Sequence, residues 1–306
     1  LSPEPPRPAS TSPVPRSVSD SARATVHRRR RRLRAAGAVV ALAALFAGAF
    51  FAVTRWLGGV AATSECIATA AGTSFSLEVD QTGNAALIAA IAHKRGLPAR
   101  AVTIALATAL QESKLRNIAH GDLDSVGLFQ QRPSQGWGTE AQILDPVYAT
   151  NAFFDALVKV KGYETMDIAA AAQRVQRSGF PTAYAKHEGI ARVFASALSG
   201  ETPRGIVCRL GDPSAPSAPT TAAAELTRLS GERGILQDGG LAVSTDSART
   251  AWAVAGWAVG RAELNAVTSV QVGDRVWTRG SDDAATTWAS ADQPIGATQV
   301  RVSFAR

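Results

Sequence analysis

The chain has 306 residues, of which 46% are hydrophobic and 19% charged, so it is long and apolar enough to bury the cores of two domains. Its net charge of +7 comes entirely from residues 1–34, which hold nine arginines and two acidic residues, and residues 35–306 are neutral in sum. A nucleic-acid-binding domain would carry its positive excess on a folded surface, so we expect no nucleic-acid partner.

The N-terminal part of the chain predicts a membrane anchor. Residues 1–33, rich in Pro, Ser, Arg and Ala, indicate a disordered, basic cytoplasmic tail. The uncharged segment 35–54 is long enough to span about 30 Å of hydrocarbon. More arginines precede this segment than follow it, which favours a cytoplasmic N-terminus and an extracytoplasmic C-terminus. We therefore expect a single-pass cell-membrane protein anchored by residues 34–57, with a signal peptide cleaved near 59–62 as the alternative.

The chain has two cysteines, Cys66 and Cys208, and both lie outside the cytoplasm in this topology. An oxidising compartment permits disulfide formation. The two residues stand near the ends of the segment 58–210, as a bond that joins the ends of a domain would. We predict that they form a disulfide, with two unrelated buried thiols as the alternative.

Residues 84–200 have the pattern of helices joined by short connections. Asn84 is expected to cap the first helix, and Pro98 and Pro146 each begin an apolar segment, where a first-turn proline belongs. Between residues 117 and 144 the pattern breaks into glycines and polar residues. Long irregular segments in a helical domain tend to carry function.

The C-terminal part of the chain has a different pattern. Residues 211–224, rich in Pro, Ser and Ala, indicate a linker. Residues 246–266 have the pattern of a helix, and three segments alternate or cluster like strands: 269–272, 275–278 and 299–304. Residues 225–306 therefore predict a small α/β domain.

One carboxylate stands at the end of a strongly apolar segment. Residues 101–110 are apolar on every side, which predicts a buried helix, and Glu112 follows at its C-terminal end. Partial burial and the negative end of the helix dipole both favour the protonated form of such a side chain. A general acid needs a transferable proton near neutral pH, so Glu112 is the candidate catalytic residue. The alternative is a surface pair with Arg116 one turn on.

The surrounding residues add a family resemblance. Glu112-Ser113, followed fourteen residues later by Gly127-Leu128-Phe129-Gln130, resembles two motifs of the soluble lytic transglycosylase and goose-type lysozyme families. The resemblance covers about residues 84–200 and implies a lysozyme-like fold. It implies that Glu112 protonates the glycosidic oxygen between N-acetylmuramic acid and N-acetylglucosamine in peptidoglycan. It further implies that Ser113 orients Glu112, and that the Gly127 backbone and the Gln130 side chain line the substrate cleft.

The sequence departs from these families at two places. Phe129 stands where the families usually have Met, and their Ala-Tyr-Asn motif is missing at the expected position, residues 171–176. Trp137 and Tyr148 are candidates either for stacking on sugar rings or for packing the loop against the core. Three further side chains are candidates for substrate binding: Gln173, Gln176 and Tyr184.

Hydrolysis and transglycosylation differ in their need for a second carboxylate. A two-carboxylate glycosidase needs a partner for Glu112 across the cleft, and Asp124 or Asp122 in the loop are the candidates. Short acidic residues in such loops also make turn hydrogen bonds. A lytic transglycosylase uses one Glu as acid and then as base, and closes the sugar's own hydroxyl onto the anomeric carbon. The resemblance favours the transglycosylase. The four histidines show no ligand spacing, so we expect no metal and no cofactor.

The end of the chain carries a second, weaker similarity. Residues 251–260, 270–277 and 300–304 are similar to the end of zinc D-alanyl-D-alanine-type peptidases. The last strand of those enzymes has a His-x-His pair that binds zinc, whereas Gln299 and Arg301 stand in that area here, and the region has no histidine. The similarity implies a binding or packing module without zinc chemistry.

These features predict the fold class and the function. We expect a mainly α lysozyme-like domain (58–210), preceded by one transmembrane helix and followed by a small α/β domain. The expected function is that of a membrane-anchored enzyme that cleaves peptidoglycan with Glu112 as its single general acid and base. Its expected partners are peptidoglycan and the membrane. The alternative is a catalytically inactive peptidoglycan-binding scaffold of a cell-envelope complex.

Overall fold

The computed structural model describes residues 44, 46–50, 64–177, 182–214, 216 and 218–305. The predicted tail (1–33) lies outside these residues, as does most of the predicted anchor (34–57). Among the described residues, every helix is too short or too polar to span a membrane. Residues Ala61–Arg306 form one compact unit.

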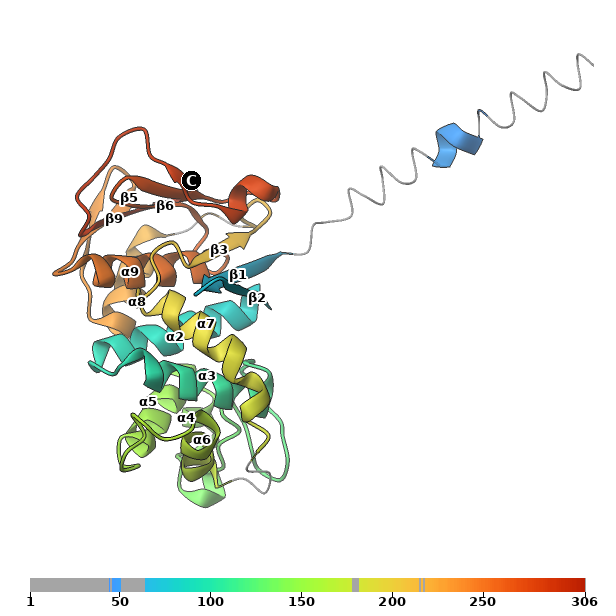
Figure 1. Ribbon diagram of the computed structural model, residues 1–306, viewed down its shortest axis with the longest axis vertical. Coiled ribbons are helices and arrows are strands. Elements are labelled where there is room, and N and C mark those ends of the chain that lie inside the picture. The colour runs from blue at the N-terminus through green and yellow to red at the C-terminus, as the bar shows by residue number, and fades with distance from the viewer. Residues whose placement is uncertain are drawn as a thin grey trace, which may run out of the picture. The chain divides into compact units, whose positions relative to one another are not determined.

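The first half of the compact unit begins with a β-hairpin and continues in helices (Figure 1). Its elements in chain order are β1 (Glu65–Ala70), β2 (Thr73–Glu78), α2 (Val79–Lys94), α3 (Ala99–Ser113), η1 (Pro133–Gln135), α4 (Glu140–Ile143), α5 (Pro146–Leu157), α6 (Ile168–Gln176), η2 (Ala185–His187) and α7 (Glu188–Leu198). Two helix starts are as predicted. Pro98 precedes α3, and α5 has Pro146 at its first position, where the Asp145 carboxylate accepts a hydrogen bond from the Val147 backbone at 2.9 Å.

The second half of the unit is richer in strands. Its elements are β3 (Ile206–Arg209), α8 (Pro219–Ser230), β4 (Gly234–Gln237), β5 (Gly240–Ser244), α9 (Ala248–Gly260), β6 (Val267–Val272), β7 (Arg275–Thr278), η3 (Asp283–Thr286), β8 (Ala289–Ser290) and β9 (Gln299–Phe304). The three predicted strands correspond to β6, β7 and β9.

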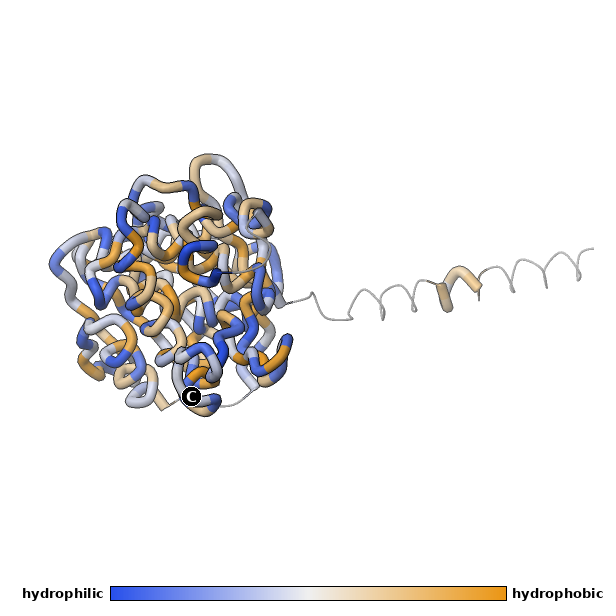
Figure 2. The backbone as a smooth tube through the Cα atoms, turned by 90° about the horizontal axis from the view of Figure 1, so that it is seen from below, coloured by the Kyte–Doolittle hydropathy of each residue, from blue (hydrophilic) through white to orange (hydrophobic). Residues whose placement is uncertain are grey.

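Helices α2 and α3 form the centre of the core. The alanine-rich α2 packs against α3, α5, α7, α8 and α9, and α3 packs against α6 and α7. Small side chains allow this close approach, because a Cβ on Gly260 of α9 would lie 2.9 Å from the Cβ of Ala86 in α2. Hydrophobic stretches run through the interior of the unit, and many hydrophilic stretches lie at its outer turns (Figure 2).

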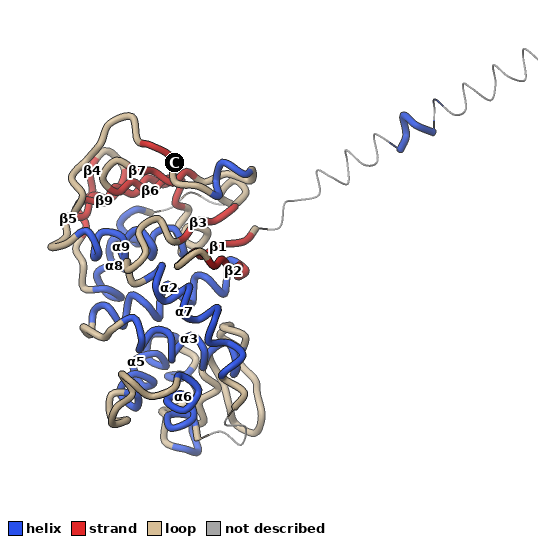
Figure 3. The backbone as a smooth tube through the Cα atoms, viewed as in Figure 1, coloured by secondary structure: helices blue, strands red, loops and turns tan. Residues whose placement is uncertain are grey.

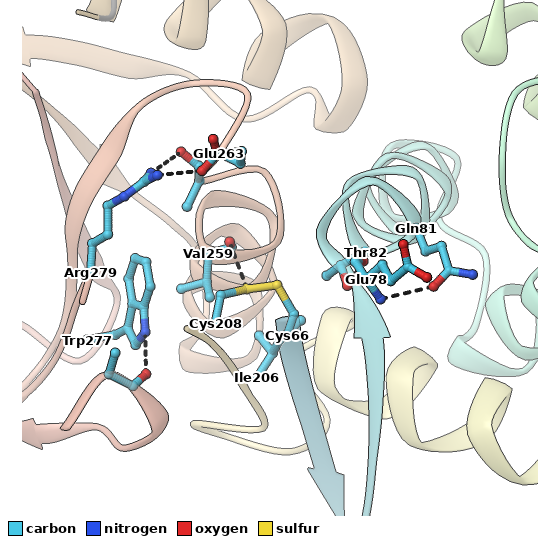
Figure 4. The surroundings of a disulfide bond; sticks show 12 residues. Cys66, Glu78, Gln81, Thr82, Ile206, Cys208, Val259, Glu263, Trp277 and Arg279 are labelled. Carbon is cyan, nitrogen blue, oxygen red and sulfur yellow. Dashed lines mark hydrogen bonds and ion pairs between the residues drawn. A yellow bond between two sulfur atoms is a disulfide. The ribbon is translucent and has the colours of Figure 1, made fainter. Parts of the chain in front are cut away.

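A small antiparallel sheet with strand order β2-β1-β3 contains the disulfide. Cys66 of β1 lies opposite Cys208 of β3 in the register, with 4.0 Å between their Cα atoms, and the two residues are bonded (Figure 4). The predicted disulfide is confirmed. The Cys208 sulfur lies 3.4 Å from the carbonyl oxygen of Val259 in α9, so the bond packs against that helix.

The larger sheet has the strand order β4-β5-β9-β6-β7-β8, and all neighbouring strands are antiparallel (Figure 3). Helix α9 packs against β6 and β9. Gln299 and Arg301, which stand where the zinc peptidases have their histidines, are exposed positions of β9. The buried positions of that strand alternate with them, so the sheet has one covered and one open face.

A buried ion pair connects α8 and α9, and a hydrogen bond from its arginine reaches α2 on the other side of the predicted linker. Arg261, just after α9, pairs with Glu225 of α8 at 2.5 Å and donates a hydrogen bond to the Gly83 carbonyl of α2 at 2.9 Å. Asn265 donates to the same carboxylate at 2.8 Å. Both charged side chains are almost fully buried, at 9% and 12% exposure. The residues before and after 211–224 therefore share one core.

The fold class expected from the sequence is wrong. The structure combines helices with two antiparallel sheets, one of them in the region expected to be mainly α. No local sequence pattern predicts the first sheet, because its strands β1 and β3 pair across 142 residues, at Cys66 and Cys208. The buried positions of β1 are Cys66, Ala68 and Ala70, which lack the bulky apolar side chains typical of strands.

Candidate active site at the end of helix α3

Helix α3 runs through the core, and Glu112 lies near its C-terminal end. Most residues of the helix are buried, and it ends where Lys114 and Leu115 adopt left-handed backbone conformations (φ 54° and 61°). Leu115 is fully buried and so fixes the end of the helix. Glu112, in the last turn, is half-buried.

The Glu112 carboxylate accepts a hydrogen bond from Tyr184. The distance between Tyr184 Oη and Glu112 Oε1 is 2.7 Å, and Tyr184 is fully buried in the segment just before α7. A hydrogen bond to a charged acceptor is stronger than one between neutral groups. The tyrosine therefore holds one oxygen of the candidate acid in a fixed position.

Ser113 connects α3 to the neighbouring wall of the site. Its hydroxyl lies 2.7 Å from the carbonyl oxygen of Leu128, to which it donates, and it accepts a hydrogen bond from the Arg116 backbone at 3.2 Å. The residue is 8% exposed. Ser113 therefore fixes the position of the segment 127–130 beside the end of the helix.

The segment 127–130 forms a tight turn closed by a β-bridge between Val126 and Gln131. Gly127 has φ 80°, and a Cβ there would lie 2.7 Å from the Ile143 carbonyl oxygen, so the turn requires glycine. The Gly127 backbone N–H donates to the Ile118 carbonyl at 2.7 Å. Gln130 has φ 46°, and its Nε2 lies 3.3 Å from the carbonyl oxygens of His120 and Gly127.

Gln176, at the end of α6, supports the same turn from another side. Its Nε2 donates to the carbonyl oxygen of Phe129 at 2.8 Å, and its Oε1 is buried with no hydrogen-bond partner among the described residues. Phe129 itself is fully buried and stacks on Phe153, with 4.6 Å between ring centroids. Of the predicted site residues, Ser113, Gly127 and Gln176 thus meet at one turn next to Glu112.

Asp124, the candidate second carboxylate, accepts hydrogen bonds from residues of its own loop. Its Oδ1 accepts from Arg132 Nε at 2.6 Å and from the Ser134 hydroxyl at 3.0 Å, and its Oδ2 accepts from the Ser134 backbone at 2.8 Å. The hydrogen bond from Arg132, followed by those from Ser134, holds the pKa of Asp124 far below its ordinary value. These bonds correspond to the alternative that the sequence left open, in which an acidic residue of this loop makes turn hydrogen bonds.

We expect Asp124→Asn to reduce the free energy of unfolding at neutral pH, because an amide is a weaker acceptor for Arg132. The depressed pKa means that the charged carboxylate stabilises the fold above its ordinary pKa of 3.8, and that this stabilisation is lost as the pH falls below that value. Urea unfolding of the native chain and the variant at about pH 7 and about pH 3 measures the difference. An equal difference at both pH values would assign the loss to packing and contradict the charge argument.

His187, a residue without an assigned role in the sequence analysis, lies beside the candidate acid's helix. Its Nε2 is 3.3 Å from Gln111 Oε1. Burial, and then the nearby positive charge of Lys186, lower the pKa of His187, so the imidazole is neutral at neutral pH. No local sequence pattern predicts this contact, because Gln111 and His187 are 76 residues apart in the chain.

The described part of the chain contains no group of three or more His, Cys, Asp or Glu side chains that could hold a metal ion. A search with protein-family models found no match to the chain, and a search of curated proteins found no similar sequence. The chemical interpretation of Glu112 therefore depends on its surroundings and on the resemblance of the two motifs.

Proposed function

We propose that this protein cleaves the glycosidic bond between N-acetylmuramic acid and N-acetylglucosamine in peptidoglycan, with Glu112 as its single general acid and base. The observation that carries the proposal is the hydrogen bond from buried Tyr184 to Glu112 beside the turn at 127–130. The resemblance of Glu112-Ser113 and Gly127–Gln130 to the motifs of lytic transglycosylases supports the same reaction.

In this reaction the protonated Glu112 donates its proton to the glycosidic oxygen as the bond to the anomeric carbon breaks. The resulting carboxylate then accepts a proton from the attacking hydroxyl. That hydroxyl belongs either to the sugar itself, which gives a transglycosylase, or to water, which gives a lysozyme. Tyr184 contributes by keeping the carboxyl oriented during both steps. Because Asp124 is engaged by Arg132 and Ser134, we favour the mechanism with one carboxylate.

The proposed location is the outer face of the cell membrane, with the N-terminus in the cytoplasm. This proposal rests on the basic and apolar sequence pattern of residues 28–54. The Cys66–Cys208 disulfide supports an oxidising, extracytoplasmic compartment.

The test is digestion of purified peptidoglycan by the purified chain, with chromatographic analysis of the soluble fragments. Anhydro-ended muropeptides are the expected products and identify a transglycosylase, whereas reducing ends identify a lysozyme. Peptidoglycan that stays intact but binds the protein would favour the inactive scaffold. It would contradict the proposal that the protein cleaves peptidoglycan.

We expect Tyr184→Phe to lower the rate of cleavage by about tenfold, because it removes the hydrogen bond that orients the Glu112 carboxyl while keeping the buried ring. The effect should fall on kcat more than on KM, because the hydroxyl orients Glu112 and does not bind substrate. Steady-state kinetics on soluble glycan fragments measures both constants. Tyr163→Phe, at a buried tyrosine elsewhere, is the matched control and should keep the native rate. Equal loss in both variants would mean that the hydroxyl of Tyr184 serves only the fold.

A further inference from the structure

A second feature of the compact unit is a cleft of about 790 Å³ bordered by α5, α6 and the residues around η1. A cleft of this size can hold several sugar or amino-acid residues. The side chains that bear on its chemistry are Trp137, Tyr148, Lys159, Arg174, Gln176 and Arg177.

The cleft carries an excess of positive charge. Lys159, Arg174 and Arg177 are exposed, and none of them forms an ion pair with any residue that the structure describes. Asp155 is the one carboxylate among the described lining residues, and Arg95 neutralises it at 2.7 Å. Three cationic groups therefore remain available for an anionic ligand, although the chain from residue 35 onward is neutral in sum.

One wall of the cleft is a fixed aromatic surface. Trp137 and Tyr148 are both half-buried. The Tyr148 ring lies directly against the backbone of Gly138, where a Cβ would come within 2.6 Å of the tyrosine oxygen. Any larger residue at Gly138 would displace the ring, so the loop and the aromatic wall are held together.

The cleft shares a structural support with the candidate active site. Gln176 lines the cleft and donates to the Phe129 carbonyl. The next carbonyl along the turn, that of Leu128, accepts the hydrogen bond from Ser113, which is adjacent to Glu112. The same turn therefore connects the wall of the cleft at Gln176 with the end of α3 at Ser113.

We propose that this cleft binds the carboxylates of the acidic peptide attached to the glycan of peptidoglycan, so that peptide-bearing glycan is the preferred substrate. The inference rests on the proposed function. Neutral sugars are recognised by stacking and hydrogen bonds and do not require three unpaired cations, whereas carboxylates are the natural partners of arginine and lysine. The aromatic wall accommodates the apolar parts of the same ligand.

The test is calorimetric titration of the full chain carrying Glu112→Gln, which is not expected to consume the ligand. Two ligands are compared: a peptide-bearing disaccharide from peptidoglycan, and the same molecule with its peptide carboxylates amidated. The acidic ligand should bind at least about tenfold more tightly, and the advantage should shrink as salt is raised. Arg174→Gln with Arg177→Gln should remove most of that advantage. Arg233→Gln, which removes an exposed cation outside the cleft, is the control and should leave it unchanged.

Equal affinity for the two ligands, no detectable binding of either, or an undiminished advantage in the double variant would each overturn the proposal. Thermal unfolding of each variant shows whether the fold is intact. Cleavage of peptidoglycan by the native chain is measured separately. A chain that cleaves peptidoglycan but does not distinguish the two ligands retains the proposed function and loses only this inference.

Discussion

Glu112→Gln is expected to reduce cleavage of peptidoglycan by at least about 100-fold, because general acid catalysis typically contributes about 100- to 10,000-fold to a rate. The amide keeps the size of the side chain, and its oxygen can still accept the hydrogen bond from Tyr184. It has no proton that it can transfer to the glycosidic oxygen. Release of soluble fragments from purified peptidoglycan, followed over time, gives the ratio of the two rates.

Glu164→Gln, which changes an exposed glutamate in the same half of the unit, is the control and should keep the native rate. The free energy of unfolding of Glu112→Gln should be close to that of the native chain, because the substitution keeps the size of the side chain and an oxygen that can accept from Tyr184. A variant that unfolds would make Glu112 a structural residue. A variant that cleaves peptidoglycan at the native rate would refute the proposal that Glu112 is the catalytic acid.

Removing the disulfide is expected to have the largest effect on stability. In the chain-entropy model, a bond that closes a loop across 142 residues stabilises the fold by about 5 kcal/mol. Cys66→Ser with Cys208→Ser should lower the free energy of unfolding by about that amount, and both positions are almost fully buried, so two hydroxyls would also be desolvated. Denaturant unfolding of the oxidised native chain and of the double variant measures the difference.

Reduction of the native chain is the second arm of this experiment, because it breaks the bond without introducing hydroxyl groups. A smaller loss on reduction than in the double variant would separate the loop-closure effect from the burial of polar groups. If the reduced and oxidised chains unfolded at the same denaturant concentration, the loop-closure argument would not apply to this protein.

Local sequence signals predicted where helices begin, except at Asn84, where a contact with a distant residue explains the difference. Pro98 and Pro146 precede or begin helices because a first-turn proline satisfies local geometry. Asn84 does not cap α2, which begins five residues earlier at Val79 and contains Gly83 in its interior. The Asn84 side chain instead donates to the Leu115 carbonyl at 2.9 Å. A contact across 31 residues decides its role, and no local pattern contains that information.

Strands were predictable where apolar residues alternate or cluster in a short segment. The valines of β6 and β9 alternate with polar residues, and these strands were expected. The strands β1 and β3 are joined by pairing between distant segments, and β4 and β5 form a short hairpin whose first strand is largely exposed. Such strands are defined by their partners more than by their own composition.

The candidate site was predictable as a set of residues but not as a set of contacts. The two motifs identify Glu112 and the turn at 127–130 from sequence alone. The hydrogen bonds of Tyr184 to Glu112 and of Gln176 to Phe129 join segments that are 72 and 47 residues apart. Their geometry depends on how α6 and α7 pack against α3. The engagement of Asp124 by Arg132 depends likewise on a loop conformation that composition does not define.

The position of the disulfide has a mechanical consequence. Tension applied between the two ends of the chain enters the compact unit at Cys66 and passes through the sulfur atoms to Cys208. The intervening residues form a closed covalent loop that contains Glu112, Tyr184 and the turn at 127–130. Stretching the chain would strain the segments outside this loop first, while the geometry around the candidate acid stayed relaxed.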